Sequence, residues 1–189
     1  MNKKQIPNLI SLLRILLVAP IAYYLWNQNY LVALLLFLVG GLSDGLDGLL
    51  ARRYHWETEL GVILDPMGDK LMMLVAYLLL GWQQLLPWWL VAVVITRDLV
   101  IVSGTLLYRY FIGKAKLRPL FISKLNTVLQ ILLVLFVMLG QVVVLPPAVV
   151  QTLVWLVALT TLLSGYSYVR EWGARALQAL SQRGDEKYD

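Results

Sequence analysis

Cysteine is absent from the sequence, and histidine occurs once, as His55. Without cysteine, the chain can form neither a disulfide bond nor a metal site built on thiolates. Charged residues are also scarce: they make up 14% of the 189 residues, against about 25% in ordinary soluble domains. His55 lies in a short polar segment, and we expect it to be solvated rather than functional.

Apolar residues take the place of the missing charges. They make up 60% of the chain, whereas about 45–50% is usual. A soluble domain of this size could not cover so much apolar surface with polar groups, so we expect lipid to surround most of the chain. The net charge of +5 would suit nucleic acid, but the basic residues follow the ends of the apolar stretches, which argues against nucleic acid.

The apolar residues form stretches long enough to cross a bilayer, which takes roughly 20 residues in a helix. We therefore predict an all-α membrane protein with six spans, at about 8–27, 30–50, 61–82, 87–109, 123–144 and 147–169. No internal repeat or low-complexity linker is visible. We predict one six-helix domain over residues 1–170 and a weakly helical, polar cytoplasmic tail over 171–189.

Most of the 16 Lys and Arg residues gather before the first span, after the second, between the fourth and fifth, and after the sixth. By the positive-inside rule, both termini and these loops are cytoplasmic. Lys3 and Lys4 precede an apolar stretch, as in a secretory signal, but Arg14 and Pro20 interrupt it, which favours an uncleaved span. With no Arg- and Ser-rich transit segment visible, we expect a bacterial cytoplasmic membrane.

Five of the 11 acidic residues lie within or at the ends of apolar spans: Asp44, Asp47, Asp65, Asp69 and Asp98. Each costs several kcal/mol there unless it is paired, hydrated or metal-bound, so such residues are functional candidates. The spacings i, i+3 and i, i+4 put the first two and the next two on one helix face each. Both pairs fall at the cytoplasmic ends of neighbouring spans.

Four clustered carboxylates repel one another unless a counter-charge is present. Oxygen ligands in that number suit Mg²⁺, Mn²⁺ or Ca²⁺ better than zinc. We therefore expect one or two divalent ions, and two would suit a displacement at phosphorus.

Glycines accompany the aspartates. Gly45, Gly48 and Gly61 would let a phosphate-bearing ligand approach the backbone, and Arg52 could donate to phosphate. Alternatively, Gly40, Gly41, Gly45 and Gly48 form a helix-packing seam, and Arg52 only sets the orientation in the membrane. Neither alternative accounts for the aspartates.

Together these residues resemble the signature of the CDP-alcohol phosphotransferase family, with every gap correct: Asp44-x2-Asp47-Gly48-x2-Ala51-Arg52-x8-Gly61-x3-Asp65-x3-Asp69. The resemblance implies a six-helix fold, usually homodimeric, with a cytoplasm-facing cavity open to lipid. It also implies that the four aspartates bind two divalent ions, Mg²⁺ or Mn²⁺, and that Asp69 is the general base. Gly48, Ala51, Arg52 and Gly61 would line the cytidine nucleotide site, with CDP-diacylglycerol as donor.

The identity of the acceptor alcohol depends on sequence patterns that are less specific than the aspartate signature. Family members that use glycerol 3-phosphate typically have a second arginine eight residues after the first of an Arg-Glu pair, and later a Gly-Lys-x-Lys-Thr stretch. Here the pair is Arg97-Asp98, the eighth position is Thr105, and the later stretch is Ser123-Lys124-Leu125-Asn126-Thr127.

Two expected cations are therefore missing, which favours a phosphodiester acceptor over a phosphate monoester. The chain is similar to the CMP-forming cardiolipin synthase branch, whose acceptor is phosphatidylglycerol. Arg97, Lys124 and Asn126 are the candidates for binding the acceptor phosphate. Phosphatidylglycerophosphate synthase remains the alternative, and the role of Asp98 is open between pairing with Arg97 or Lys124 and direct contact with the acceptor.

A divalent-cation transporter is the competing function of another class, because intramembrane carboxylates also line ion pathways. A conduit predicts polar groups through the whole membrane depth. The signature aspartates instead gather at one end of two spans, and the fifth and sixth spans contain no acidic residue. A closed cavity, and hence an enzyme, fits this pattern better.

Overall fold

The computed structural model describes residues 6–54, 59–111 and 121–185, and within them the side chains of 13, 15–43, 68–104 and 121–171. These ranges are all-helical, as predicted, with six helices and no strand. Each predicted span coincides with one helix to within a few residues, apart from the C-terminal helix: α1 (Ile6–Trp26), α2 (Tyr30–Tyr54), α3 (Glu59–Trp82), α4 (Trp88–Phe111), α5 (Phe121–Gly140) and α6 (Pro147–Asp185). That last helix runs on through most of the segment predicted as a weakly helical tail.

The chain divides into two compact units. The first consists of Met1–Trp88 and Val134–Val149, and the second of Trp89–Leu133 and Val150–Asp189. The first unit contains α1, α2 and α3, and the second contains α4, the first part of α5 and nearly all of α6.

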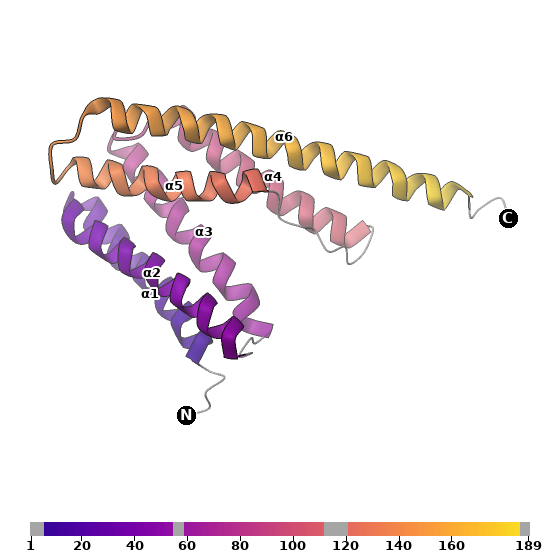
Figure 1. Cartoon of the computed structure of the whole chain (residues 1–189), viewed down its shortest axis with the longest axis horizontal. Coiled ribbons are helices and arrows are strands. Elements are labelled where there is room, and N and C mark those ends of the chain that lie inside the picture. The colour runs from indigo at the N-terminus through magenta and orange to yellow at the C-terminus, as the bar shows by residue number, and fades with distance from the viewer. Residues whose placement is uncertain (1–5, 55–58, 112–120, 186–189) are drawn as a thin grey trace. The chain divides into compact units, whose positions relative to one another are not determined.

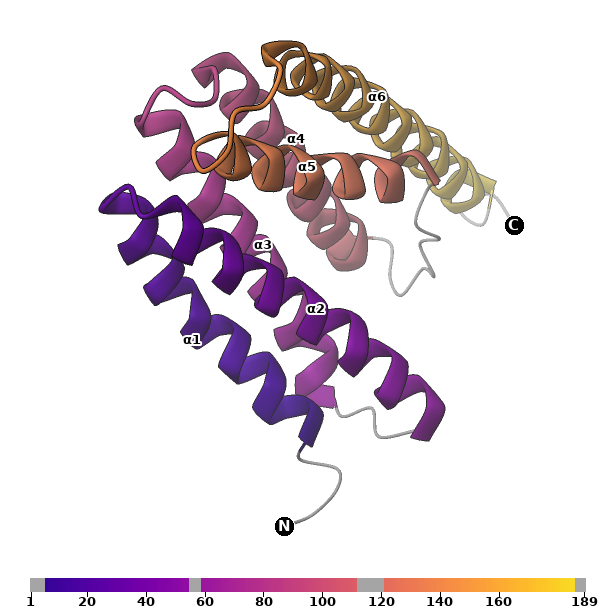
Figure 2. The ribbon, with the colours of Figure 1, turned by 60° about the vertical axis from the view of Figure 1, so that its left-hand side comes forward.

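In the first unit, α1 packs against both α2 and α3. The chain runs up α1, back down α2 and up again along α3, so that neighbouring helices are antiparallel (Figures 1 and 2). Apolar side chains from all three helices are buried between them, among them Ile21, Leu25, Ala33, Phe37, Met72, Ala76, Tyr77 and Leu80. This packing fixes α2 and α3, which carry the aspartate signature.

The turns after α1 and α3 are built alike. Gln28 and Gln84 have left-handed backbones, with φ of 57° and 62°. The amide of Gln28 donates to the Leu25 carbonyl and that of Asn29 to the Tyr24 carbonyl, at 3.0 and 2.9 Å. The same pattern, a Schellman motif, recurs with the amides of residues 84 and 85. Each motif satisfies end carbonyls that would otherwise lack a partner.

The Gln83 side chain ties these two turns together. Its Nε2 donates to the Leu25 carbonyl at the end of α1, and its Oε1 accepts from the Tyr30 hydroxyl at 3.0 Å. One amide therefore joins the end of α3 to the end of α1 and the start of α2.

The outward-facing side chains of the described helices are largely apolar. On α2, for example, more than a third of the surface of each of the following is exposed: Leu31, Leu35, Leu38, Val39 and Leu42. In the searched part of the chain, Phe121–Gly140 and Pro147–Glu171 are long and apolar enough to cross a membrane, and Ile15–Trp26 and Tyr30–Ser43 are shorter apolar helices. Contiguous exposed apolar surface of this kind marks contact with lipid or a partner.

The two hydrogen bonds of the Gln83 side chain predict that Gln83 contributes more to stability than the adjacent Gln84 does. Gln83→Met keeps the side-chain length but removes both hydrogen bonds, and should lower the free energy of unfolding by about 1–3 kcal/mol. Gln84→Met is the control, because the Gln84 side chain is exposed and the substitution leaves its backbone conformation in place. Thermal unfolding in detergent micelles measures both, and equal effects would contradict this role of Gln83.

Candidate functional site

The two aspartate pairs lie on neighbouring helices of the first unit. Asp44 and Asp47 belong to the C-terminal half of α2, and Asp65 and Asp69 to the N-terminal half of α3. Because α2 and α3 run antiparallel (Figure 2) and are consecutive in the chain, both pairs lie toward the same end of the two helices. Helical geometry places each pair on one face, one turn apart.

Of the four carboxylates, only that of Asp69 belongs to the described side chains, where it is half-buried. The side chains of Asp44, Asp47 and Asp65 lie outside the described residues, as do those of the predicted nucleotide site, Gly48, Ala51, Arg52 and Gly61. Among the side chains that were searched, no three Asp, Glu or His groups come together. The metal and nucleotide assignments therefore stay predictions.

A side chain of α3 contacts α2 about one turn from both aspartate pairs. A Cβ built on Gly40 would lie 3.2 Å from Sδ of Met72. Gly40 is four residues before Asp44, and Met72 is three residues after Asp69. A Cβ on Gly41 would meet nothing within 4 Å. Gly40 is thus a packing glycine, and Gly41 is not.

The placement of the aspartates along the helices suits a shared cation site. Four carboxylates toward the same end of two consecutive antiparallel helices would form an all-oxygen donor set, the kind that hard divalent cations prefer. The helix placement therefore fits Mg²⁺ or Mn²⁺.

In the second unit, Arg97 of α4 lies in a polar cluster. Its Nη1 donates to Oδ1 of Asp98 at 2.6 Å, and its Nη2 donates to the hydroxyls of Ser123 on α5 and Ser164 on α6, each at 2.6 Å. The Arg97 side chain is 9% exposed, and its Nε is buried without a hydrogen-bond partner. Of the roles left open for Asp98, the structure shows the pairing with Arg97.

A second polar layer lies one turn along α5. The Asn126 side chain is fully buried, and its Oδ1 accepts from the Thr161 hydroxyl at 2.9 Å. The Thr160 hydroxyl lies 2.8 Å from both that oxygen and the Leu156 carbonyl, so its single proton goes to one of them. The amide nitrogen of Asn126 has no hydrogen-bond partner. Polar bonds between helices of this kind hold α5 and α6 together.

The predicted acceptor residues thus lie in different surroundings. Arg97 and Asn126 are buried in successive polar layers, while Lys124 is exposed. Ser164, which is fully buried and bonds Arg97, was not predicted. An uncharged small residue in an apolar stretch gives no sequence signal. The contact of these residues with an acceptor stays a prediction.

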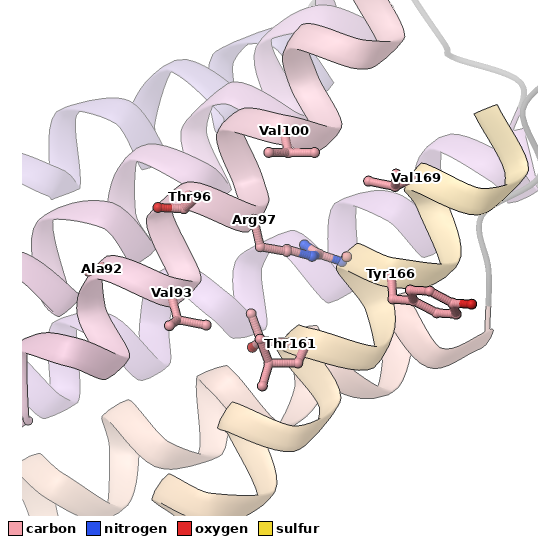
Figure 3. Close-up of a pocket in the computed structure, with 10 residues that line it drawn as sticks. Ala92, Val93, Thr96, Arg97, Val100, Thr161, Tyr166 and Val169 are labelled. Carbon is pink, nitrogen blue, oxygen red and sulfur yellow. The ribbon is translucent and has the colours of Figure 1, made fainter. Parts of the chain in front are cut away.

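A pocket of about 390 Å³ lies between α4 and α6 beside the Arg97 cluster. In Figure 3 the Arg97 side chain extends from α4 toward α6 among the lining residues. Among the described residues the lining is mostly apolar, with one charged group: Ala92, Val93, Thr96, Arg97, Val100, Thr161, Leu162, Gly165, Tyr166 and Val169. This part of the pocket combines one guanidinium with hydrocarbon walls.

Residues 4–163 match the family model described as CDP-alcohol phosphatidyltransferase. Over 95% of its length, the chain is 32% identical to a cardiolipin synthase (CMP-forming) of Rattus norvegicus, and it spans 65% of that relative. Over 86%, it is 33% identical to a chloroplastic CDP-diacylglycerol–glycerol-3-phosphate 3-phosphatidyltransferase 1 of Oryza sativa subsp. japonica, spanning 55% of it. Over 65%, it is 32% identical to a putative cardiolipin synthase of Mycobacterium tuberculosis, spanning 58% of it.

The contrast between Gly40 and Gly41 gives a prediction about the geometry of the site. Gly40→Leu would have to displace the Met72 side chain or shift α2 relative to α3. It should therefore lower the melting temperature, and should reduce any activity that depends on the aspartates by at least about tenfold. Gly41→Leu places the same side chain in open space and should change neither. If both variants behaved alike in an unfolding and an activity assay, the contact at Gly40 would not control the site.

Proposed function

Because the chain belongs to the CDP-alcohol phosphatidyltransferase family, we propose that it transfers the phosphatidyl group of CDP-diacylglycerol to a hydroxyl of phosphatidylglycerol. The products are cardiolipin and CMP. The proposal names the activity that the rat relative's name states.

The proposed enzyme spans the membrane with all six helices, with both termini and the aspartates at the cytoplasmic face, and works as a homodimer. Residues 1–170 form its catalytic domain, and 171–189 its cytoplasmic tail. The bacterial cytoplasmic membrane is its proposed location, as inferred from the sequence, and one of the relatives is bacterial. The exposed apolar side chains of the described helices support the membrane setting.

The choice of acceptor depends on one observation, the single and already paired cation of the α4–α6 pocket. Among the described residues, Arg97 is the only charged one that lines the pocket, and Asp98 already neutralises much of its charge. A phosphate monoester such as glycerol 3-phosphate carries nearly two negative charges and needs several convergent cations. A phosphodiester carries one and needs fewer.

In the proposed reaction, Asp69 accepts the proton of the acceptor hydroxyl. The hydroxyl oxygen then attacks the phosphorus that bears diacylglycerol, and the bond from this phosphorus to the bridging oxygen breaks, so that CMP leaves with the electron pair. Divalent ions held by Asp44, Asp47, Asp65 and Asp69 would supply positive charge for the pyrophosphate and the departing oxygen. Gly48, Ala51, Arg52 and Gly61 bind the cytidine nucleotide.

Phosphatidylglycerophosphate synthesis is the second candidate, because the rice relative is named for transfer to glycerol 3-phosphate. The two candidates share the donor and the aspartates and differ only in the acceptor. A direct comparison of acceptors therefore separates them.

The purified protein should release CMP from CDP-diacylglycerol in the presence of phosphatidylglycerol and form cardiolipin. Glycerol 3-phosphate in its place should yield at least about a hundredfold less product, since a site lacking the required polar partners discriminates by that order or more. Lipid products are separated by mass after incubation with each acceptor. Product formed only from glycerol 3-phosphate would establish the second candidate instead.

The role of Asp69 predicts a separation of binding from chemistry. Asp69→Asn keeps the side-chain shape but removes the basic oxygen, and should reduce transfer by about 10²–10⁴-fold. The affinity for CDP in the presence of Mn²⁺ should change by less than about fivefold, because three carboxylates remain. Transfer close to the unmodified rate would refute a general base at this position.

A further inference from the structure

The pocket between α4 and α6 has features that the transfer chemistry alone does not require. Its walls are hydrocarbon from both helices, including Val93 and Val100 on α4 and Leu162 and Val169 on α6. Several of these side chains are also exposed on the outer surface, with Leu162 at 61% and Val169 at 56%. The pocket is therefore an open groove, not an enclosed cavity.

One end of the ligand that this groove would hold must be polar. The Arg97 side chain lines the groove and is only 9% exposed. Its Nε has no hydrogen-bond partner. A buried N–H that lacks an acceptor costs free energy and calls for a ligand or a water. The hydroxyls of Ser123 and Ser164 accept from Arg97, which leaves each hydroxyl proton available to a further acceptor.

Gly165 keeps the groove open beside this polar end. A Cβ built there would lie 3.7 Å from Cγ of Arg97, which is ordinary van der Waals contact. A methyl group therefore fits, whereas a larger side chain would occupy groove space beside Arg97.

The size of the groove limits the ligand. Its volume of about 390 Å³ is near the lower end of the roughly 300–1,000 Å³ usual for ligand pockets. This is room for one hydrocarbon chain rather than for a whole two-chain lipid. The other chain would remain in the bilayer.

We propose that this groove holds one acyl chain of the acceptor phospholipid, with its phosphodiester bound to the Arg97 guanidinium. The inference rests on the proposed function and names how that acceptor is recognised. The donor suits the groove less well, because its pyrophosphate needs a cation-rich site and Arg97 is the one charged residue among the described lining residues. A chain that leaves the bilayer for the groove gains no hydrophobic energy, so the groove acts by shape, positioning the headgroup at Arg97.

The absence of cysteine allows a direct test with single-cysteine variants. Leu162→Cys places a fluorescent label in the groove. Leu163→Cys is the control, because it is the next residue of α6, lies at nearly the same depth, is also exposed at 45% and does not line the groove. Each labelled protein is placed in nanodiscs of phosphatidylcholine that contain a fixed fraction of either phosphatidylglycerol or phosphatidylcholine with a nitroxide on one acyl chain.

At position 162, nitroxide-bearing phosphatidylglycerol should quench at least about twofold more than nitroxide-bearing phosphatidylcholine, and at position 163 the two should quench equally. Equal quenching by both lipids at both positions would contradict the binding of a phosphatidylglycerol chain in the groove. Because quenching needs no turnover, it can succeed where cardiolipin formation fails, which separates this inference from the proposed function.

A kinetic readout tests the same site without a label. Gly165→Leu should raise the KM for phosphatidylglycerol about tenfold and leave the KM for CDP-diacylglycerol unchanged. Glycerophosphoglycerol, which has the same phosphodiester but no acyl chain, should be used equally by the variant and the unmodified protein. Thr152→Leu, at an exposed position of α6 outside the groove, is the control. Equal losses with both acceptors would contradict a chain-binding groove.

Discussion

Repulsion between carboxylates at the same end of two apolar helices is the constraint on which the proposed site depends. Asp44 and Asp47 on α2, and Asp65 and Asp69 on α3, lie in helices whose other residues are mostly apolar. Such a group of charges is stable only with compensating cations. The contact of Gly40 with the Met72 side chain lies about one turn from both pairs. The helices that carry the four aspartates thus belong to one compact unit.

Buried polar groups in the second unit also need compensation, and there hydrogen bonds and an ion pair provide it. Arg97 is compensated by Asp98 and by the two serines, and Asn126 by the two threonines of α6. These hydrogen bonds join α4, α5 and α6. Arg97, the cation that lines the groove among the described residues, keeps one buried nitrogen without a partner. The proposed choice of a diester over a monoester acceptor rests on this small number of cations.

The helices were predictable from the sequence because their apolar stretches are long and are separated by polar turns. The aspartate pairs were predictable because charges within apolar stretches are conspicuous and their spacing sets a shared face. The contacts of Gln83 with Leu25 and Tyr30 were not, because they join residues more than 50 positions apart. Ser164 and the groove were missed for a similar reason, since small and apolar residues carry no signal until the helices are packed. The helical continuation to Asp185 was underestimated, because a polar composition does not prevent a helix.

The central claim, that the aspartates are held by bound cations, is tested most directly by counting Mn²⁺ ions bound to the purified protein by electron paramagnetic resonance. We predict two ions per protomer, with at least one lost in Asp65→Asn and both lost on chelation. A protein that binds no Mn²⁺, or that forms its lipid product equally well in excess chelator, would contradict the account.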